Sequence, residues 1–141
     1  YKDVNLTTDI IVGFPGETDE EFNKTYQFLK EIKFYKMHVF KYSPRKGTKA
    51  AVMPNQISGD IKEKRSRELL ELSNENELEY NQKYTGNEVE VLFEEEKEKI
   101  YKGHTQNYIL VYCQTDKKID NKIEKVICKK AEQDHIFGEV L

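Results

Sequence analysis

Cysteine is scarce in this sequence, which holds only Cys113 and Cys128 among 141 residues. Two cysteines without an export signal do not suggest a disulfide framework, so a reducing cytoplasm is the expected compartment. The sequence also lacks an apolar run of about 18 residues, so no membrane span is expected. It opens with YKDVNLTTD, which has no charged start followed by an apolar core, and a signal peptide is not predicted. Because the first residue is Tyr1 rather than methionine, we expect a piece of a longer protein.

An excess of basic residues is missing as well. The formal net charge is −3, and 35% of the residues are charged. Residues 1–85 hold 14 Lys plus Arg and 14 Asp plus Glu, whereas residues 86–141 hold 9 and 12, so the second segment carries the whole net charge. This balance does not favour a strongly basic nucleic-acid module. The length allows one ordinary domain or two small ones.

The most informative stretch that is present is DIIVGFPGETDEEF at 9–22. Its apolar run IIV is continuous rather than alternating, which is typical of a strand covered on both faces in a parallel sheet. Pro15 and Gly16 fit the central positions of a type II turn. Thr18 with Glu21 predicts a capping box at a helix start. The stretch is either an ordinary turn that connects the strand and helix of a βα unit, or a place where glycine lets the backbone approach a ligand.

The following segments extend this pattern into a βαβ unit. Apolar residues at helical spacing predict an amphipathic helix from about 18 to 33, and MHVFKY at 37–42 predicts a second, parallel strand. Two parallel strands leave unpaired edges and need helices on both faces. Residues 1–85 therefore resemble the last portion of a larger α/β domain.

A polar loop at 43–58 leads into a long helix predicted from about 61 to 84. Arg65 and Asn76 interrupt the apolar stripe of this helix. Its stripe is therefore a weaker indication of a buried core than the stripe of the first helix.

The apolar period changes to two after the long helix, which indicates strands. Four or five short strands in about 55 residues suggest a small barrel, because closure removes exposed edges. The predicted strand runs lie near 88–93, 108–113, 123–128 and 136–141, with a charged hairpin at 94–104. The predicted class is therefore α+β. Residues 1–85 would form the last portion of an α/β domain with a long linking helix, and residues 86–141 a small antiparallel OB-like β-barrel.

Three motifs, in this order, resemble one enzyme family. They are TDIIVGFPGE at 8–17, HVFKYSPRKGT at 38–48 and KGHTQNYILV at 102–111. Together they are similar to the carboxyl-terminal part of a MiaB-like methylthiotransferase, a radical S-adenosylmethionine enzyme with an appended TRAM domain. The resemblance implies that residues 1–85 are a partial parallel (β/α) barrel remnant, the end of the radical S-adenosylmethionine barrel, and that residues 86–141 are the TRAM-like β-barrel. HVFKYSPR, with TTD before the first strand, is more similar to the branch that methylthiolates N6-threonylcarbamoyladenosine in tRNA (the MtaB branch) than to the other branches.

The resemblance implies a transferase that modifies the tRNA anticodon region with S-adenosylmethionine and two 4Fe-4S clusters. A CxxxCxxC motif holds one cluster in this family, and the chain lacks it; its two cysteines are interpreted as small apolar residues of the barrel. We therefore expect no metal site and no catalytic residue here. We also expect no activity from the piece alone and a dependence on upstream cluster-binding domains.

The resemblance also assigns three sets of site residues. The cofactor-binding set, which would flank the adenine of S-adenosylmethionine, is Ile11, Val12, Gly13, Phe14, Val39 and Phe40. The substrate-binding set is Tyr42, Ser43, Arg45 and Thr48. The RNA-binding set, which combines donors with an aromatic ring, is Lys102, His104, Thr105, Asn107 and Tyr108. The Arg45 guanidinium suits the carboxylate of a threonylcarbamoyl group, and the alternative is a local bond to a backbone carbonyl or an acid.

Other interpretations stay open at this point. The chain would also fit a non-catalytic RNA-binding or structural module, with the barrel remnant as scaffold. Within the family, the isopentenyladenosine branch and the ribosomal-protein branch are alternatives. An open sheet edge further allows dimerisation with a second copy.

Overall fold

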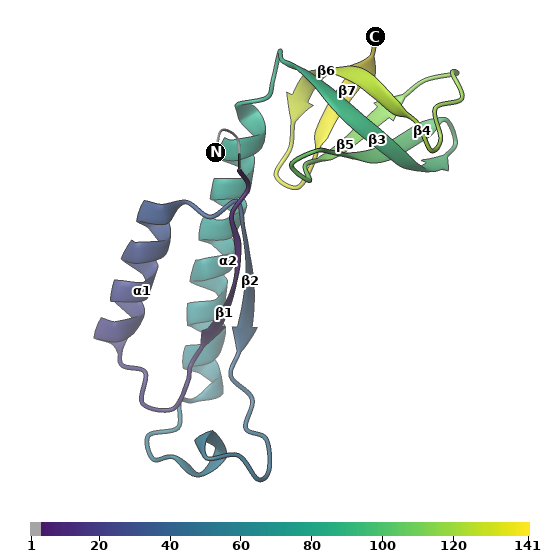
Figure 1. Cartoon of the computed structure of the whole chain (residues 1–141). Coiled ribbons are helices and arrows are strands. Elements are labelled where there is room, and N and C mark those ends of the chain that lie inside the picture. Colours follow the sequence, from purple (N-terminus) through teal and green to yellow (C-terminus); the bar gives the residue numbers. More distant parts are fainter. Residues whose placement is uncertain (1–3) are drawn as a thin grey trace. The chain divides into compact units, whose positions relative to one another are not determined.

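The computed structural model describes residues 4–141 (Figure 1). In chain order its elements are β1 (Thr7–Val12), α1 (Asp19–Ile32), β2 (Lys36–Lys41), a short 3-10 helix (Ala50–Val52), α2 (Gly59–Gln82), β3 (Glu88–Lys97), β4 (Ile100–Thr105), β5 (Leu110–Gln114), β6 (Ile123–Ala131) and β7 (Ile136–Val140). They form two compact units, Leu6–Asn76 and Glu77–Leu141, the latter joined by Val4 and Asn5. No helix in this described part is long and apolar enough to cross a membrane. The α+β class is confirmed.

In the first unit, β1 and β2 form a two-stranded parallel sheet, as the βαβ pattern predicts. The packed core joins one sheet face to both helices and consists of Val12, Phe22, Leu29, Met37, Leu69 and Leu72. On the other face Ile11 is 56% exposed and Phe40 is 54% exposed. The expectation of a first strand covered on both faces is therefore wrong for residues 4–141, because α1 and α2 share one side of the sheet (Figure 1).

The turn between β1 and α1 has the predicted geometry. The Glu17 amide donates to the Phe14 carbonyl at 2.9 Å, and Gly16 has φ of 88°, as the third position of a type II turn requires. The capping box is also present: the Glu21 amide donates to the Thr18 hydroxyl at 3.2 Å, and the Thr18 amide donates to the Glu21 carboxylate at 2.9 Å. Contacts within this short segment therefore support the start of α1 at Asp19.

The two polar interruptions in the stripe of α2 are buried and paired. Arg65 is 4% exposed and Asn76 is 8% exposed. The Asn76 amide donates to the carbonyl of Phe34 at 3.2 Å, just before β2. One turn earlier, the Ser73 hydroxyl accepts from the amide of Met37 at 2.9 Å. Polar side chains of α2 thus satisfy backbone groups near the start of β2, which would otherwise be costly to bury.

The second unit is a closed five-stranded barrel with strand order β3-β4-β5-β7-β6. β3 closes the barrel by pairing with β6. Four of the five strand pairs within residues 77–141 are antiparallel, and the β5–β7 pair is parallel. The barrel has the size and the five strands of an OB-fold, a fold whose second and third strands and adjoining loops bind oligonucleotides.

Alternate residues of each barrel strand point inward and form the core. The largest fully buried side chains include Phe93, Val111 and Val126. Cys113 and Cys128 lie in the same core, each 1% exposed and neither in a disulfide. The prediction that the cysteines pack as small apolar residues is confirmed.

Candidate functional site

The predicted cofactor side chains divide between the two faces of the β1–β2 sheet. Ile11 lies opposite Phe40 in the strand register, and both point to the open face. Val12 is buried in the helix-covered core, and Val39 packs partly buried against that core. Within the two strands, Ile11 and Phe40 are thus the members of the predicted set that offer apolar side chains on the open face, and Val12 and Val39 offer backbone groups at most. Phe14, which follows β1, is 44% exposed.

Aromatic residues of both predicted sets meet just beyond the strands. The rings of Phe14 and Tyr42 make an edge-to-face contact with centroids 5.3 Å apart. The Tyr42 amide donates to the Val12 carbonyl at 2.9 Å, which extends the pairing by one residue. The Tyr42 hydroxyl is buried and has no hydrogen-bond partner among the described residues. A buried phenol without a partner at the carboxyl end of a parallel strand is a feature of a binding site.

Gly13 is a glycine for reasons of packing and conformation. It has φ of 72°, and a Cβ atom there would overlap Cγ of Lys62 and lie 3.1 Å from its Cδ. Its amide donates to the Glu17 carboxylate at 3.0 Å. Lys62 in turn donates to the Tyr42 carbonyl at 2.9 Å, and its ammonium lies 5.2 Å from the centroid of that ring. The Gly13 amide is thus already bonded inside the chain.

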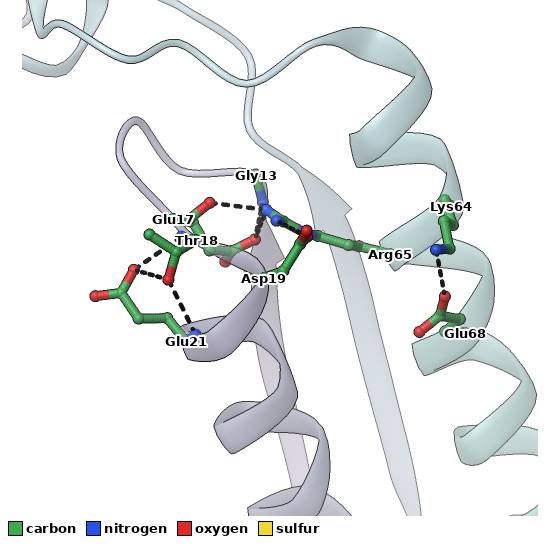
Figure 2. Close-up of polar contacts among 8 residues, drawn as sticks. All are labelled: Gly13, Glu17, Thr18, Asp19, Glu21, Lys64, Arg65 and Glu68. Carbon is green, nitrogen blue, oxygen red and sulfur yellow. Dashed lines mark hydrogen bonds and ion pairs between the residues drawn. The ribbon is translucent and has the colours of Figure 1, made fainter.

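A buried arginine fixes the same turn from the side of α2 (Figure 2). Arg65 donates from Nη1 to the Glu17 carboxylate at 2.6 Å and to the Glu17 carbonyl at 3.1 Å. Its Nη2 donates to the Asp19 carboxylate at 2.7 Å. Because Glu17 also accepts from Gly13, one network joins the end of β1, the start of α1 and α2. In the sequence, the one sign that Arg65 joins these elements was its position in the apolar stripe of the long helix.

The predicted substrate residues Ser43, Arg45 and Thr48 lie in the exposed loop after β2. Thr48 is used within the loop, since its amide and hydroxyl both donate to the Arg45 carbonyl, at 3.1 and 2.8 Å. The Arg45 guanidinium makes no hydrogen bond or ion pair with any residue from 4 to 141. The Asn55 carbonyl accepts from the Gly16 amide at 2.9 Å, which brings this loop against the turn after β1.

Metal ligation is not provided by the described residues. No group of three or more His, Cys, Asp or Glu side chains between residues 4 and 141 is placed to hold an ion. Burial raises the pKa of the Cys113 thiol to about 12 and also raises the pKa of Cys128. Two buried thiols that pack in the barrel core with raised pKa values do not fit cluster ligation, which uses thiolates.

The predicted RNA-binding residues also divide into two kinds. Thr105 is buried; its hydroxyl donates to the Asn107 side chain at 2.7 Å and accepts from the Ile109 amide at 2.9 Å. Asn107 donates to the Tyr84 hydroxyl at 2.7 Å. These two residues shape the turn between β4 and β5. Tyr108, with φ of 68°, is 75% exposed at that turn.

Lys102, His104 and Tyr108 make ring and charge contacts on the outside of the barrel. The ring of His104 stacks on that of Tyr108, with centroids 4.5 Å apart and planes 16° from parallel. Nδ1 of His104 lies 2.7 Å from the Glu94 carboxylate. Lys102 pairs with Glu95 at 3.4 Å. His104 and Tyr108 line a groove of about 390 Å³ together with side chains from β3 and β6.

An aromatic cluster on the next part of the barrel was not predicted. Tyr112 of β5 lies opposite Phe137 of β7, and both flank His135. The His135 ring makes edge contacts with Tyr112 and Phe137, with centroids 5.0 and 4.6 Å apart. The period-two pattern places Tyr112 on the outside, but only the parallel β5–β7 pairing brings Phe137 beside it.

Comparison with known proteins gives relatives that match nearly the whole chain. It is 43% identical over 131 residues to the threonylcarbamoyladenosine tRNA methylthiotransferase MtaB of Bacillus subtilis, covering 89% of this chain and 29% of that protein. It is 41% identical over 140 residues to a tRNA-2-methylthio-N(6)-dimethylallyladenosine synthase of Aquifex aeolicus, covering 99% of this chain and 32% of that protein. It is 54% identical over 89 residues to a synthase of the same name from Tropheryma whipplei, covering 63% and 19%. No family model matches.

Fold and site define an α+β protein in which a βαβ unit precedes a closed OB-like barrel. At these levels of identity, the chain belongs to the MiaB and MtaB family of tRNA methylthiotransferases, which confirms the resemblance carried by its three motifs. The chain spans about a third or less of the length of the curated relatives it matches.

Proposed function

We propose that this chain is the carboxyl-terminal part of a cytoplasmic tRNA methylthiotransferase that acts on N6-threonylcarbamoyladenosine beside the anticodon. Residues 1–85 would be the end of the radical S-adenosylmethionine barrel with its linking helix, and residues 86–141 the TRAM-like module. The observation that carries the proposal is 43% identity with MtaB over 131 residues. Relatives named for dimethylallyladenosine make that branch the alternative substrate class.

The open face of the β1–β2 sheet fits part of a cofactor site. S-adenosylmethionine, when bound in such an enzyme, supplies the radical that starts the reaction. Ile11 and Phe40 would contact its adenine, and the unpaired Tyr42 hydroxyl would offer a hydrogen bond at the same end of the sheet. The cluster ligands would come from upstream domains, because the two cysteines here are buried in the barrel. This chain alone would therefore be inactive.

Arg45 is the residue best suited to hold the threonylcarbamoyl carboxylate, since its guanidinium has no partner among the described residues. In the full-length enzyme, Arg45→Ala should raise KM for threonylcarbamoylated tRNA by about tenfold or more, the cost of a charge-assisted hydrogen bond. Lys46→Ala, which removes a neighbouring exposed charge, is the matched control. Equal kinetics for the two variants would contradict the assignment.

The barrel would contact the anticodon region of tRNA through Lys102, His104 and Tyr108, of which Tyr108 is exposed and the other two are half-buried. We expect the chain to bind an anticodon stem-loop at low salt, and the affinity to fall as salt rises, because phosphate contacts release counterions. The acidic balance of residues 86–141 predicts weak binding, in the micromolar range or above. Absence of binding at low salt would remove the RNA contact from the proposal.

A non-catalytic RNA-binding or structural module is the second candidate. The observation in its favour is that the barrel is closed and complete, whereas the two-stranded sheet keeps unpaired edges among the described residues. A CxxxCxxC motif encoded within about 150 residues upstream, roughly one domain, would favour the enzyme. Without such a motif, the open edge would be expected to pair with another copy of the chain.

A further inference from the structure

The groove on the outer face of β3 has an apolar floor built from three strands. Leu92 of β3 is the register partner of both Ile123 on β6 and His104 on β4, so these three side chains form one row across the barrel. Leu92 is 42% exposed and Ile123 is 67% exposed. The groove volume of about 390 Å³ falls within the range of small-molecule sites, about 300–1,000 Å³.

An aromatic wall stands at one side of this floor. Tyr108 stacks on His104 with nearly parallel rings, so His104 holds the phenol ring at the edge of the groove. Tyr108 lies in the turn between β4 and β5, where its backbone is left-handed with φ of 68°. A flat ring that is 75% exposed is a stacking surface for another planar group.

Carboxylates form the polar part of the same groove. Glu90 and Glu94 both line it. Glu94 lies 2.7 Å from His104, whereas Glu90 makes no hydrogen bond or ion pair with any residue from 4 to 141. Ionised carboxylates accept hydrogen bonds and repel both phosphates and carbonyl oxygens. A ligand that suits the groove is therefore planar, has apolar faces, and carries N–H donors on its edge.

Cations lie beside the groove on the same outer face. Lys125 of β6 is the register partner of Glu90, and Lys102 follows the same side of β4 two residues before His104. A ligand whose ring enters the groove would leave any attached phosphate outside the acidic part, where lysine side chains reach it.

We propose that this groove binds one unstacked RNA base that carries an exocyclic amino group, stacked on Tyr108 and donating to Glu90 or Glu94. The inference rests on the proposed tRNA contact and adds to it a base-selective pocket. Glu and Asp side chains accept from the cytosine amino group, whereas uracil presents a carbonyl oxygen at the same ring position. The pocket therefore selects amino-bearing bases over uracil. The same carboxylates that weaken overall RNA affinity are responsible for this selectivity.

The test compares nine-nucleotide single-stranded oligo(C) and oligo(U) binding to the 141-residue chain at low salt and pH 7.5. We expect the chain to prefer oligo(C) several-fold. Tyr108→Asn, which keeps a residue type that tolerates the left-handed backbone, should weaken oligo(C) binding about tenfold or more, the cost of one lost stacking contact. Tyr108→Phe keeps the ring and should bind like the parent chain. Circular dichroism melting confirms that each variant folds.

The double variant Glu90→Gln with Glu94→Gln should abolish the preference for oligo(C) while strengthening oligo(U) binding. Its control, Glu71→Gln with Glu75→Gln on exposed positions of α2, removes the same charge and should leave the preference unchanged. Binding that is indifferent to Tyr108→Asn, or an unchanged base preference in the groove variant, would overturn the inference and leave the tRNA contact standing. If the parent chain binds neither the oligonucleotides nor the anticodon stem-loop, both the tRNA contact and the base pocket are refuted.

Discussion

A single arginine, Arg65, holds together the turn that follows β1 through several hydrogen bonds. Arg65 is 4% exposed, and its guanidinium bonds Glu17 and Asp19 at the same time. Glu17 keeps its side chain 17% exposed and also holds the Gly13 amide. Arginine suits this position because its planar fork reaches two acceptors on different elements, which a lysine ammonium does less well.

Removing this guanidinium should destabilise the first unit strongly. Arg65→Ala leaves the half-buried Glu17 carboxylate without its cation, and we expect a loss of about 3 kcal/mol in the free energy of unfolding. Arg67→Ala, at an exposed position of the same helix, should cost no more than about 0.5 kcal/mol. Urea denaturation followed by circular dichroism measures both. Similar midpoints for the two variants would show that the network is not a stabilising one.

The two cysteines give a residue-scale prediction about pH. Burial raises the pKa of Cys113 to about 12, above the value of about 8.5 for an unfolded thiol. Between these pH values the folded state holds the proton and the unfolded state does not, so stability should fall as pH rises from about 8.5 towards 12. At pH 8 both thiols should resist a disulfide exchange reagent in the native chain and react fully in urea. Rapid reaction of either thiol in the native chain would contradict their burial.

At the scale of elements, the sequence predicts those features that depend on neighbours along the chain. The type II turn and capping box at 9–22 were predicted and are present, because each depends on contacts within a few residues. The predicted strand is also present, although its pairing partner β2 lies beyond α1 in the chain. The long helix was predicted from about 61 to 84 and occupies Gly59–Gln82. Arg65 could not be assigned as buried from the sequence, because its partners lie 46 and 48 residues away.

Strand pairing in the barrel depends on a close approach at Gly103. A Cβ atom there would overlap the Leu92 carbonyl and lie 2.8 Å from the Cα atom of Phe93, where the β3–β4 register shifts. Gly103→Ala should therefore destabilise the barrel by about 2 kcal/mol or more, because backbone atoms cannot move aside cheaply. Gly59→Ala, where nothing lies within 4 Å, is the control and should be close to neutral. Comparable melting temperatures for the two variants would contradict this account of β3–β4 packing.

At the scale of the whole molecule, the sites depend on pairings that the sequence does not reveal. The row of Ile123, Leu92 and His104 exists because β3 pairs with β6 on one side and β4 on the other. The sequence predicted His104 and Tyr108 as two of five RNA-binding residues, but it predicted neither their stacking nor the apolar floor beside them. Likewise, the period of the first strand did not show that Val12 faces the helices while Ile11 faces the open side.

We propose that the full-length protein containing this segment methylthiolates N6-threonylcarbamoyladenosine in tRNA. The most direct measurement is mass analysis of tRNA nucleosides from the parent strain and from a strain that lacks the full-length gene. In the deletion strain we expect the methylthio derivative of N6-threonylcarbamoyladenosine to disappear and its unmethylthiolated precursor to accumulate, and we expect the reintroduced gene to restore the product. An unchanged level of this nucleoside in the deletion strain would contradict the proposal, and loss of the isopentenyladenosine derivative instead would assign the chain to the other branch.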